Sequence, residues 1–143
     1  MTAITEALTA DHKACDELLA QAEDSISTAD WQTGSPLFHN FRERLERHLA
    51  AEENILFPKF EQATGQTAGP TQMMRMEHHQ MRQLLVEMDQ AVSEQDDATW
   101  LGLSETLMML IQQHNMKEQQ ILYPMTDQVF GNTAADVVQQ MGL

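Results

Sequence analysis

Two histidine–glutamate pairs are the residues of this chain whose types and spacing could do chemistry. His48 stands four residues before Glu52, and His114 stands four residues before Glu118. Residues four apart lie one above the other on the same face of an α-helix, so each pair can present an imidazole nitrogen and a carboxylate oxygen together. Both groups are ligands of first-row metal ions. The spacing therefore predicts metal binding by both pairs.

The two pairs belong to an internal repeat with an offset of 66 residues (48 to 114). The segment His48–Pro58 aligns with the segment His114–Pro124, and five of the eleven aligned residues are identical. The same offset carries His12 onto His78, each of which follows an acidic residue. We therefore predict two equivalent helical hairpins related by a pseudo-two-fold axis, each supplying two histidines and one glutamate.

The predicted ligands fall on apolar helix faces. The flanking residues are Leu45, Leu49 and Leu56 for the first pair and Leu107, Ile111 and Leu122 for the second. A carboxylate buried among such residues is costly unless it is paired or bound to a metal ion. Counted along the helices, the four histidines also fall at about the same depth. The predicted metal ligands are His12, His48, Glu52, His78, His114 and Glu118.

Other titratable residues are interpreted by the helix face on which they fall. His39 and His79 have polar neighbours and are predicted to lie on the surface. Glu53 points about 100° away from Glu52 around the helix, so we predict that it is solvated.

Three further residues lie close in sequence to the predicted ligand histidines. Asp11 and Glu77 precede two of those histidines. Adjacent residues do not share a helix face, so any hydrogen bond from them would reach a histidine of a neighbouring helix. Cys15 is predicted to be a small core residue.

Helices must position these side chains, because apolar residues recur at intervals of three and four in every long segment. We expect long helices over about residues 2–27, 36–63, 70–93 and 97–130, and a short helix over 133–140. Four long helices with short connections predict an all-α, up-down-up-down antiparallel four-helix bundle with a short C-terminal helix.

We expect one domain over residues 1–143, built from the hairpins 1–64 and 70–131. Ser35-Pro36 is a capping residue followed by proline, which predicts that the second helix begins there, after a turn over residues 28–34. Pro58 and Pro124 fall inside helical patterns, so a kink or an early helix end is expected at both.

Composition narrows the class of protein. The 22 acidic and 8 basic residues give a net charge of -14, which disfavours binding to nucleic acid or to anionic membranes. Eleven Met, with only six Gly and four Pro, favour helical structure. The single cysteine excludes an internal disulfide and a cysteine-based metal site. Charged residues interrupt the N-terminal segment, so we expect neither a signal peptide nor a membrane span, and a cytoplasmic location.

The pattern resembles the hemerythrin-like HHE cation-binding family over nearly the whole chain. The matching residues are His12, His48, Glu52, Pro58, His78, His114, Glu118 and Pro124. The resemblance implies a four-helix bundle around a non-haem di-iron site. It also implies that the four histidines are terminal ligands and that Glu52 and Glu118 bridge the two ions.

The chain departs from the oxygen-carrying hemerythrins at two positions. Those proteins have a second histidine one turn after the third-helix ligand and an aspartate five residues after the last, where this chain has Arg82 and Gln119. The resemblance therefore implies a symmetric site of two irons joined by an oxo or hydroxo bridge, each with one open position. The ligand count looks like that of di-iron proteins that repair damaged iron centres. Nitrogen and carboxylate ligands also suit manganese or zinc.

We therefore expect a hemerythrin-like di-iron protein that reacts with or senses O2, NO or peroxide, in iron-centre repair or in the response to oxidative or nitrosative stress. Two alternatives stay open: a reversible O2 carrier, and a structural or sensory bundle stabilised by metal. Any turnover would be of a di-iron oxidoreductase type. The sequence assigns no protein partner and no oligomeric state.

Overall fold

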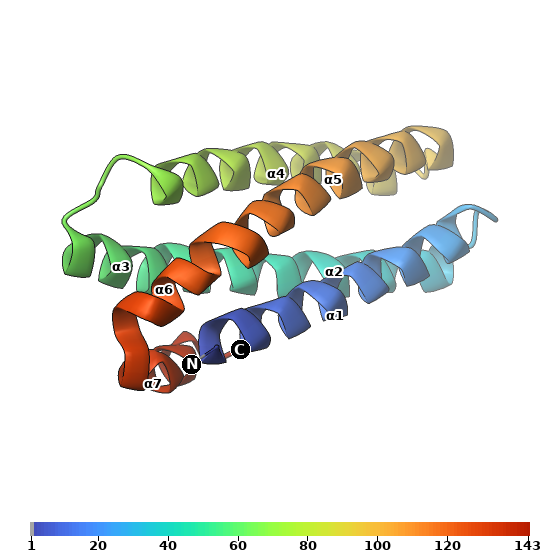
Figure 1. The fold of residues 1–143 in the computed structure, drawn as a ribbon. Helices are drawn as coiled ribbons and strands as arrows, with labels where there is room; N and C mark the ends of the chain where they lie inside the picture. Colours follow the sequence, from blue (N-terminus) through green and yellow to red (C-terminus); the bar gives the residue numbers. More distant parts are fainter. Residues whose placement is uncertain (1) are drawn as a thin grey trace.

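The computed structural model describes residues 2–143 as an antiparallel four-helix bundle, and no strand occurs between these residues. The elements are α1 (Ala3–Ile26), α2 (Trp31–Ala51), η1 (Glu52–Leu56), α3 (Phe57–Thr64), α4 (Pro70–Ser93), α5 (Asp97–Lys117), η2 (Glu118–Leu122), α6 (Tyr123–Phe130), η3 (Gly131–Thr133) and α7 (Ala134–Met141). The segments α2-η1-α3 and α5-η2-α6 each form one long arm, paired with α1 and α4 respectively (Figure 1). The predicted all-α bundle is confirmed.

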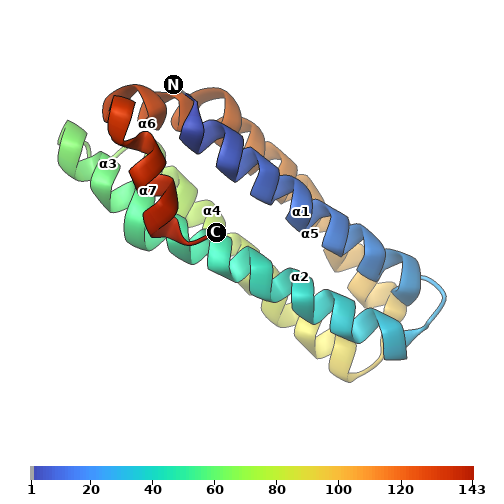
Figure 2. The same ribbon diagram turned by 90° about the horizontal axis from the view of Figure 1, so that it is seen from below.

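Two apolar clusters hold the bundle together, one in each half of its length. The half that contains the α1–α2 and α4–α5 connections buries residues such as Leu19, Phe38 and Trp100. The other half buries Ile4 and Leu56 beneath α7, which lies against α1 and η1 (Figure 2). Each long arm runs through both apolar clusters, and its two predicted metal ligands lie between them. The polar site therefore lies between two apolar layers that fix the rotation of every helix.

The second helix begins five residues earlier than the sequence predicted. It starts at Trp31, because Asp30 is its N-cap and accepts a hydrogen bond from the backbone N–H of Thr33 at 3.2 Å. Such a cap satisfies one of the free N–H groups at a helix start. Pro36 consequently lies inside the helix. The prediction of a turn up to Gly34 with a start at Ser35-Pro36 was wrong.

The same connection is built again at the start of α5. Asp96 accepts a hydrogen bond from the backbone N–H of Thr99 at 3.1 Å, 66 residues after the equivalent bond (30 to 96). The residues that precede the two caps, Ala29 and Gln95, have positive φ values of 59° and 52°. The internal repeat thus extends to the loops, so both hairpins enter their second helix in the same way.

Neither proline ends its helix. The five residues before Phe57-Pro58 and before Tyr123-Pro124 form the π-helical segments η1 and η2, in which a residue bonds to the carbonyl five positions earlier. Proline has no backbone N–H to donate to the carbonyl four residues earlier. The π turn just before it changes the hydrogen-bonding pattern of the helix. Of the kink or early end that was expected at each proline, the structure shows a change from α-helical to π-helical bonding just before it. Glu52 and Glu118 are the first residues of the two π turns.

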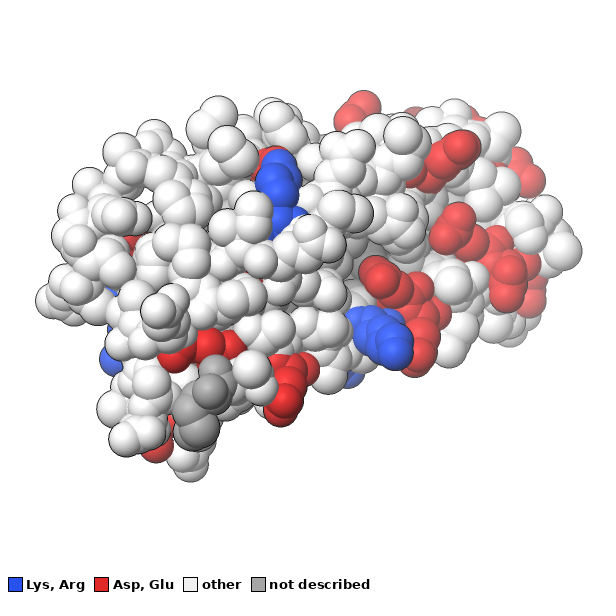
Figure 3. Space-filling view, viewed as in Figure 1, with Lys and Arg blue, Asp and Glu red and all other residues white. Residues whose placement is uncertain are grey.

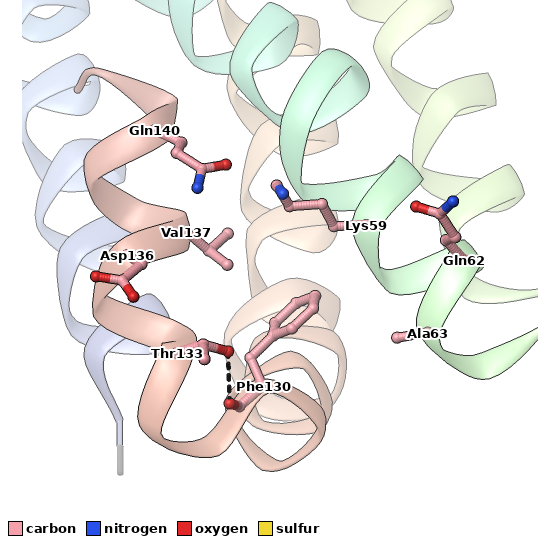
Figure 4. A pocket seen from close by; sticks show the side chains of 8 residues that line it. All are labelled: Lys59, Gln62, Ala63, Phe130, Thr133, Asp136, Val137 and Gln140. Carbon is pink, nitrogen blue, oxygen red and sulfur yellow. Dashed lines mark hydrogen bonds between the residues drawn. The ribbon is translucent and has the colours of Figure 1, made fainter.

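The C-terminal helix α7 closes the end of the bundle that is opposite the two tight connections. It stands away from α3, and side chains of α3, α6, η3 and α7 line the hollow between them (Figure 4). The hollow has a volume of about 430 Å³, and Lys59 and Asp136 are its charged residues. None of the predicted metal ligands lines it.

The surface is acidic in patches. Figure 3 shows Asp and Glu side chains gathered at the end of the bundle that carries the α1–α2 and α4–α5 connections. Within residues 2–143, none of the helices has a stretch long and apolar enough to cross a bilayer.

Asp127 caps the first helix from a distant part of the chain. Its carboxylate accepts hydrogen bonds from the backbone N–H groups of Ile4 at 2.9 Å and of Thr5 at 3.0 Å, and from the Thr5 hydroxyl at 2.6 Å. These two N–H groups belong to the first turn of α1, where no preceding carbonyl can accept them. An acidic group there also interacts favourably with the helix dipole. One side chain therefore ties α6 to the start of α1.

We predict that Asp127→Ala lowers the free energy of unfolding by about 1–2 kcal/mol, the range seen when helix caps are removed. Urea denaturation followed by circular dichroism measures this change. Glu87→Ala, at an exposed position in the middle of α4, is the control and should be close to neutral. Equal stability of the two variants would contradict the capping role.

Candidate metal centre

The structure brings all six predicted ligands together midway along the bundle. Each is buried, with at most 6% of its surface exposed. They come from six elements: His12 from α1, His48 from α2, Glu52 from η1, His78 from α4, His114 from α5 and Glu118 from η2. We call these residues the six-residue cluster. The surface positions predicted for His39 and His79 are confirmed, since both are exposed.

Four imidazole Nε2 atoms and the two carboxylates face one another inside this cluster. Glu118 Oε1 lies 3.2 Å from the Nε2 atoms of both His12 and His114. Glu52 Oε1 lies 3.2 Å from His78 Nε2 and 3.6 Å from His48 Nε2.

The potential ligand atoms form two overlapping groups, each within 4.8 Å. One group comprises Glu52, His78, His114 and Glu118, and the other comprises His12, His48 and Glu118. Each group could hold a metal ion, and Glu118 belongs to both groups.

Hydrogen bonds fix the opposite nitrogen of every histidine. Asp11 accepts from His48 Nδ1 at 2.7 Å, and Glu77 accepts from His114 Nδ1 at 2.8 Å. Both acidic residues thus bond to a histidine of the neighbouring helix, which is where the sequence indicated that any such bond would reach. Bonds of this kind orient the imidazole and leave its other nitrogen free for a metal ion.

Basic residues hold these acidic partners in turn. Asp11 also accepts from Arg44, at 2.7 and 2.9 Å, and Glu77 pairs with Lys117. Although burial raises the pKa of Asp11, the bonds from His48 and Arg44 outweigh it and lower that pKa below its ordinary value. The carboxylate of Asp11 therefore stays ionised beside the imidazole that it orients.

The prediction that Glu53 is a solvated residue was wrong. Its side chain is only 22% exposed, and it accepts hydrogen bonds from His78 Nδ1 at 2.8 Å and from Arg82 at 2.8 and 3.0 Å. Burial raises the pKa of Glu53, but His78 and Arg82 outweigh it and lower the pKa to about 2. Glu53 points away from Glu52 as expected, but towards α4 and not into solvent.

Gln119 occupies the position equivalent to Glu53 in the repeat and has the same role. Its amide oxygen lies 2.9 Å from His12 Nδ1. The offset of 66 residues pairs the two positions (53 to 119), so the repeat shows that they are equivalent but not which side chains they contact. His78 faces the charged carboxylate of Glu53, whereas His12 faces the neutral amide of Gln119. The two halves of the site therefore differ in charge.

The buried charges of the cluster depend on one another. Burial and then the charge of Glu118 raise the pKa of Glu52. Burial also acts on Glu118, but the surrounding histidines, His114 foremost, outweigh it and lower its pKa. Burial lowers the pKa of His78, but the nearby Glu52 carboxylate and the hydrogen bond to Glu53 raise it to about 9. His78 is therefore protonated at neutral pH when no metal is bound, and a cation bound at this position would displace that proton.

The donor atoms fit a metal ion. Among the described residues 2–143, the buried side-chain atoms without a hydrogen-bond partner include Glu52 Oε1, His78 Nε2, His114 Nε2 and Glu118 Oε2. Buried polar atoms are normally paired, and an unpaired carboxylate oxygen is especially costly. All four belong to one group of potential ligands. The set contains nitrogen and oxygen donors only, which suits first-row cations such as iron, manganese and zinc.

Tyr123 is a residue of the site that the sequence analysis missed. Its hydroxyl donates to Glu52 Oε2 at 2.6 Å and lies 2.8 Å from Glu118 Oε1. Burial, followed by the charges of the two glutamates, raises its pKa well above the ordinary value. The equivalent position in the other half is Phe57 (57 to 123), so the site is less symmetric than the resemblance implied.

A small apolar cavity adjoins the cluster. It has a volume of about 10 Å³ and is lined by His12, Cys15, Leu45, His48, Leu49, Met81, Ile111, His114 and Asn115. A cavity of this size holds about one water-sized molecule. Cys15 is buried as predicted, and burial raises the pKa of its thiol to about 12. The thiol is therefore protonated at neutral pH.

Comparisons with known proteins agree with this geometry. The family model of the hemerythrin HHE cation binding domain matches residues 3–126. An uncharacterized hemerythrin-like protein of Schizosaccharomyces pombe is 26% identical over 121 residues, which cover 84% of this chain and 57% of that protein. The chain thus matches little more than half the length of that relative. No solved structure matches the chain. With a buried cluster of histidines and glutamates inside its bundle, this metal-binding chain belongs to the hemerythrin HHE cation-binding domain family.

Proposed function

We propose that this chain is a non-haem di-iron protein that reacts with or senses O2, NO or peroxide. The observation that carries the proposal is the arrangement of the six-residue cluster. Four imidazole nitrogens and two glutamates converge in a buried space, and every imidazole is held from behind by a hydrogen bond. This arrangement supports His12, His48, His78 and His114 as terminal ligands, with Glu52 and Glu118 between the two ions.

The donor set and the family favour a pair of iron ions. The two groups of potential ligands share Glu118, which supports two adjacent cations bridged by a carboxylate. Iron is favoured over manganese and zinc by the likeness to hemerythrins. When bound, iron would supply reversible oxidation and open coordination positions for a small ligand.

The surrounding residues restrict what can reach the cluster. The apolar side chains of the 10 Å³ cavity leave space for one water-sized molecule. The ligands themselves are at most 6% exposed. Both facts favour a diatomic molecule or peroxide over an organic substrate. A centre of this kind would suit iron-centre repair or the response to oxidative or nitrosative stress.

Reaction with small oxidants tests this proposal. Iron(II)-loaded protein, prepared without air, should change its near-ultraviolet and visible absorption within one equivalent of O2, NO or peroxide, while metal-free and zinc-loaded protein should not. Absence of a response to all three by protein that contains iron would contradict the proposal. Release of intact O2 under vacuum would instead favour a reversible carrier.

A further inference from the structure

The hydroxyl of Tyr123 lies where the ligand atoms of one half of the cluster converge. Its oxygen is 2.6 Å from Glu52 Oε2 and 2.8 Å from Glu118 Oε1. It is also 3.1 Å from His12 Nε2 and 3.4 Å from His48 Nε2. Four predicted metal ligands therefore surround one phenol oxygen.

Each of these four neighbours can present a lone pair to the hydroxyl. His48 Nδ1 faces a carboxylate oxygen and His12 Nδ1 faces an amide oxygen, so in the neutral rings the hydrogen is on Nδ1 and Nε2 presents a lone pair. The two glutamate oxygens are also acceptors. The hydroxyl has one proton to donate to four acceptors. A cation among these atoms could instead accept a lone pair from each of them.

The separations are those of atoms that share an ion. Two ligands at about 2.1 Å from one ion lie about 3.0 Å apart at a right angle and about 3.4 Å apart at a tetrahedral angle. The Tyr123 oxygen lies 2.6–3.4 Å from its four neighbours, and His12 Nε2 and His48 Nε2 are themselves 3.1 Å apart. The phenol oxygen thus fits as a further ligand beside these two histidines.

The equivalent aromatic residue of the other half shows what the hydroxyl adds. The Phe57 ring lies against His78, with centroids 5.7 Å apart and planes 25° apart. The Tyr123 ring lies against His12 in nearly the same way, at 5.6 Å and 28°. Both rings are fully buried. The packing of the ring is therefore common to both halves, and the oxygen is present in one half only.

We propose that Tyr123 is a phenolate ligand of the metal ion held by His12 and His48. When the ion binds, the phenol O–H bond breaks, the proton leaves to solvent, and an oxygen lone pair forms the bond to the cation. No electron is transferred in this step. A bound cation favours such deprotonation because it stabilises the anion. The inference rests on the proposed di-iron function and makes the two ions chemically different.

The absorption and Raman spectra of the iron(III)-loaded protein test the inference. A phenolate bound to iron(III) gives a charge-transfer band in the visible range and enhanced phenolate ring vibrations in the resonance Raman spectrum. Tyr123 is the one tyrosine in the sequence, so any such signal belongs to it. We expect both features in the native protein and their complete loss in Tyr123→Phe, which keeps the ring. Metal loading should also release one proton more per chain from the native protein than from this variant.

Iron content distinguishes failure of the Tyr123 proposal from failure of the di-iron proposal. Native protein that binds two irons without phenolate features would overturn the ligand role of Tyr123 and leave the di-iron proposal intact. Persistence of the visible band in iron-loaded Tyr123→Phe would also overturn that role. Native protein that binds no iron would overturn both proposals. Should the variant fail to fold, the Raman spectrum of the native protein decides the question by itself.

Discussion

Replacing Glu118 with glutamine is expected to abolish binding of both metal ions. Glu118 belongs to both groups of potential ligands, and one of its oxygens lies 3.2 Å from His12 Nε2 and from His114 Nε2. Glutamine has nearly the same shape, but it lacks the negative charge and turns an NH2 group towards the ions. The variant should therefore lose metal without loss of the fold.

The stability of the Glu118→Gln protein, compared with that of the native protein, is a second measurable effect. The histidines around Glu118 lower its pKa, so its charge stabilises the metal-free fold. Removing one partner of such a buried pair is destabilising. We therefore expect the metal-free variant to unfold at a lower urea concentration than the metal-free native protein, and only the native protein to gain stability when metal is added. Metal content after desalting and urea denaturation measure the two effects.

Two other glutamates provide graded controls for this substitution. Glu105→Gln changes an exposed residue of α5 and should retain both ions. Glu53→Gln changes a residue that bonds only to the outer nitrogen of His78 and to Arg82, and should weaken metal binding about 10- to 100-fold, as is usual for such partners. Two ions retained in Glu118→Gln would contradict the bridging position.

Replacing each of the two adjacent histidines of α4 should give the second large difference in metal binding. His78 is fully buried in the cluster, whereas its neighbour His79 is exposed. We expect His78→Ala to lose at least one metal ion and His79→Ala to bind two. At free metal about 1,000 times above Kd, one bound ion stabilises the fold by about 4 kcal/mol. His78→Ala should therefore also lose most of the stabilisation that metal gives to the native protein.

Metal analysis and thermal unfolding with and without metal measure both consequences for this pair of variants. Each substitution removes an imidazole from the same helix, so effects on helix propensity are matched. Loss of metal from His79→Ala alone would show that the wrong histidine was assigned to the cluster.

Periodicity predicted the bundle because each helix is amphipathic by itself. The third helix was predicted over 70–93 and is found at Pro70–Ser93, since proline and the end of the apolar pattern are local signals. The start of α2 was missed because two local signals compete, and the cap at Asp30 prevails over Ser35-Pro36. The repeat could have decided between them, because Asp96 is the equivalent cap of α5.

The six-residue cluster was predictable because ligand spacing within one helix follows directly from helical geometry. Glu53, Gln119 and Tyr123 were not, because their roles depend on how neighbouring helices are rotated and on the two π turns. Glu53 of η1 accepts a hydrogen bond from His78 of α4. The Tyr123 hydroxyl reaches Glu52 from a different arm of the bundle. Such contacts are properties of packing, although comparison of the two halves of the repeat reveals where they differ.

Iron stoichiometry tests the central claim most directly. Metal-free protein would be titrated with iron(II) in the absence of air and desalted, and its iron and protein contents would be measured. We predict two irons per chain for the native protein and none for Glu118→Gln. A ratio near zero for the native protein, or equal ratios in the two proteins, would contradict the assignment of the six-residue cluster as a di-iron centre.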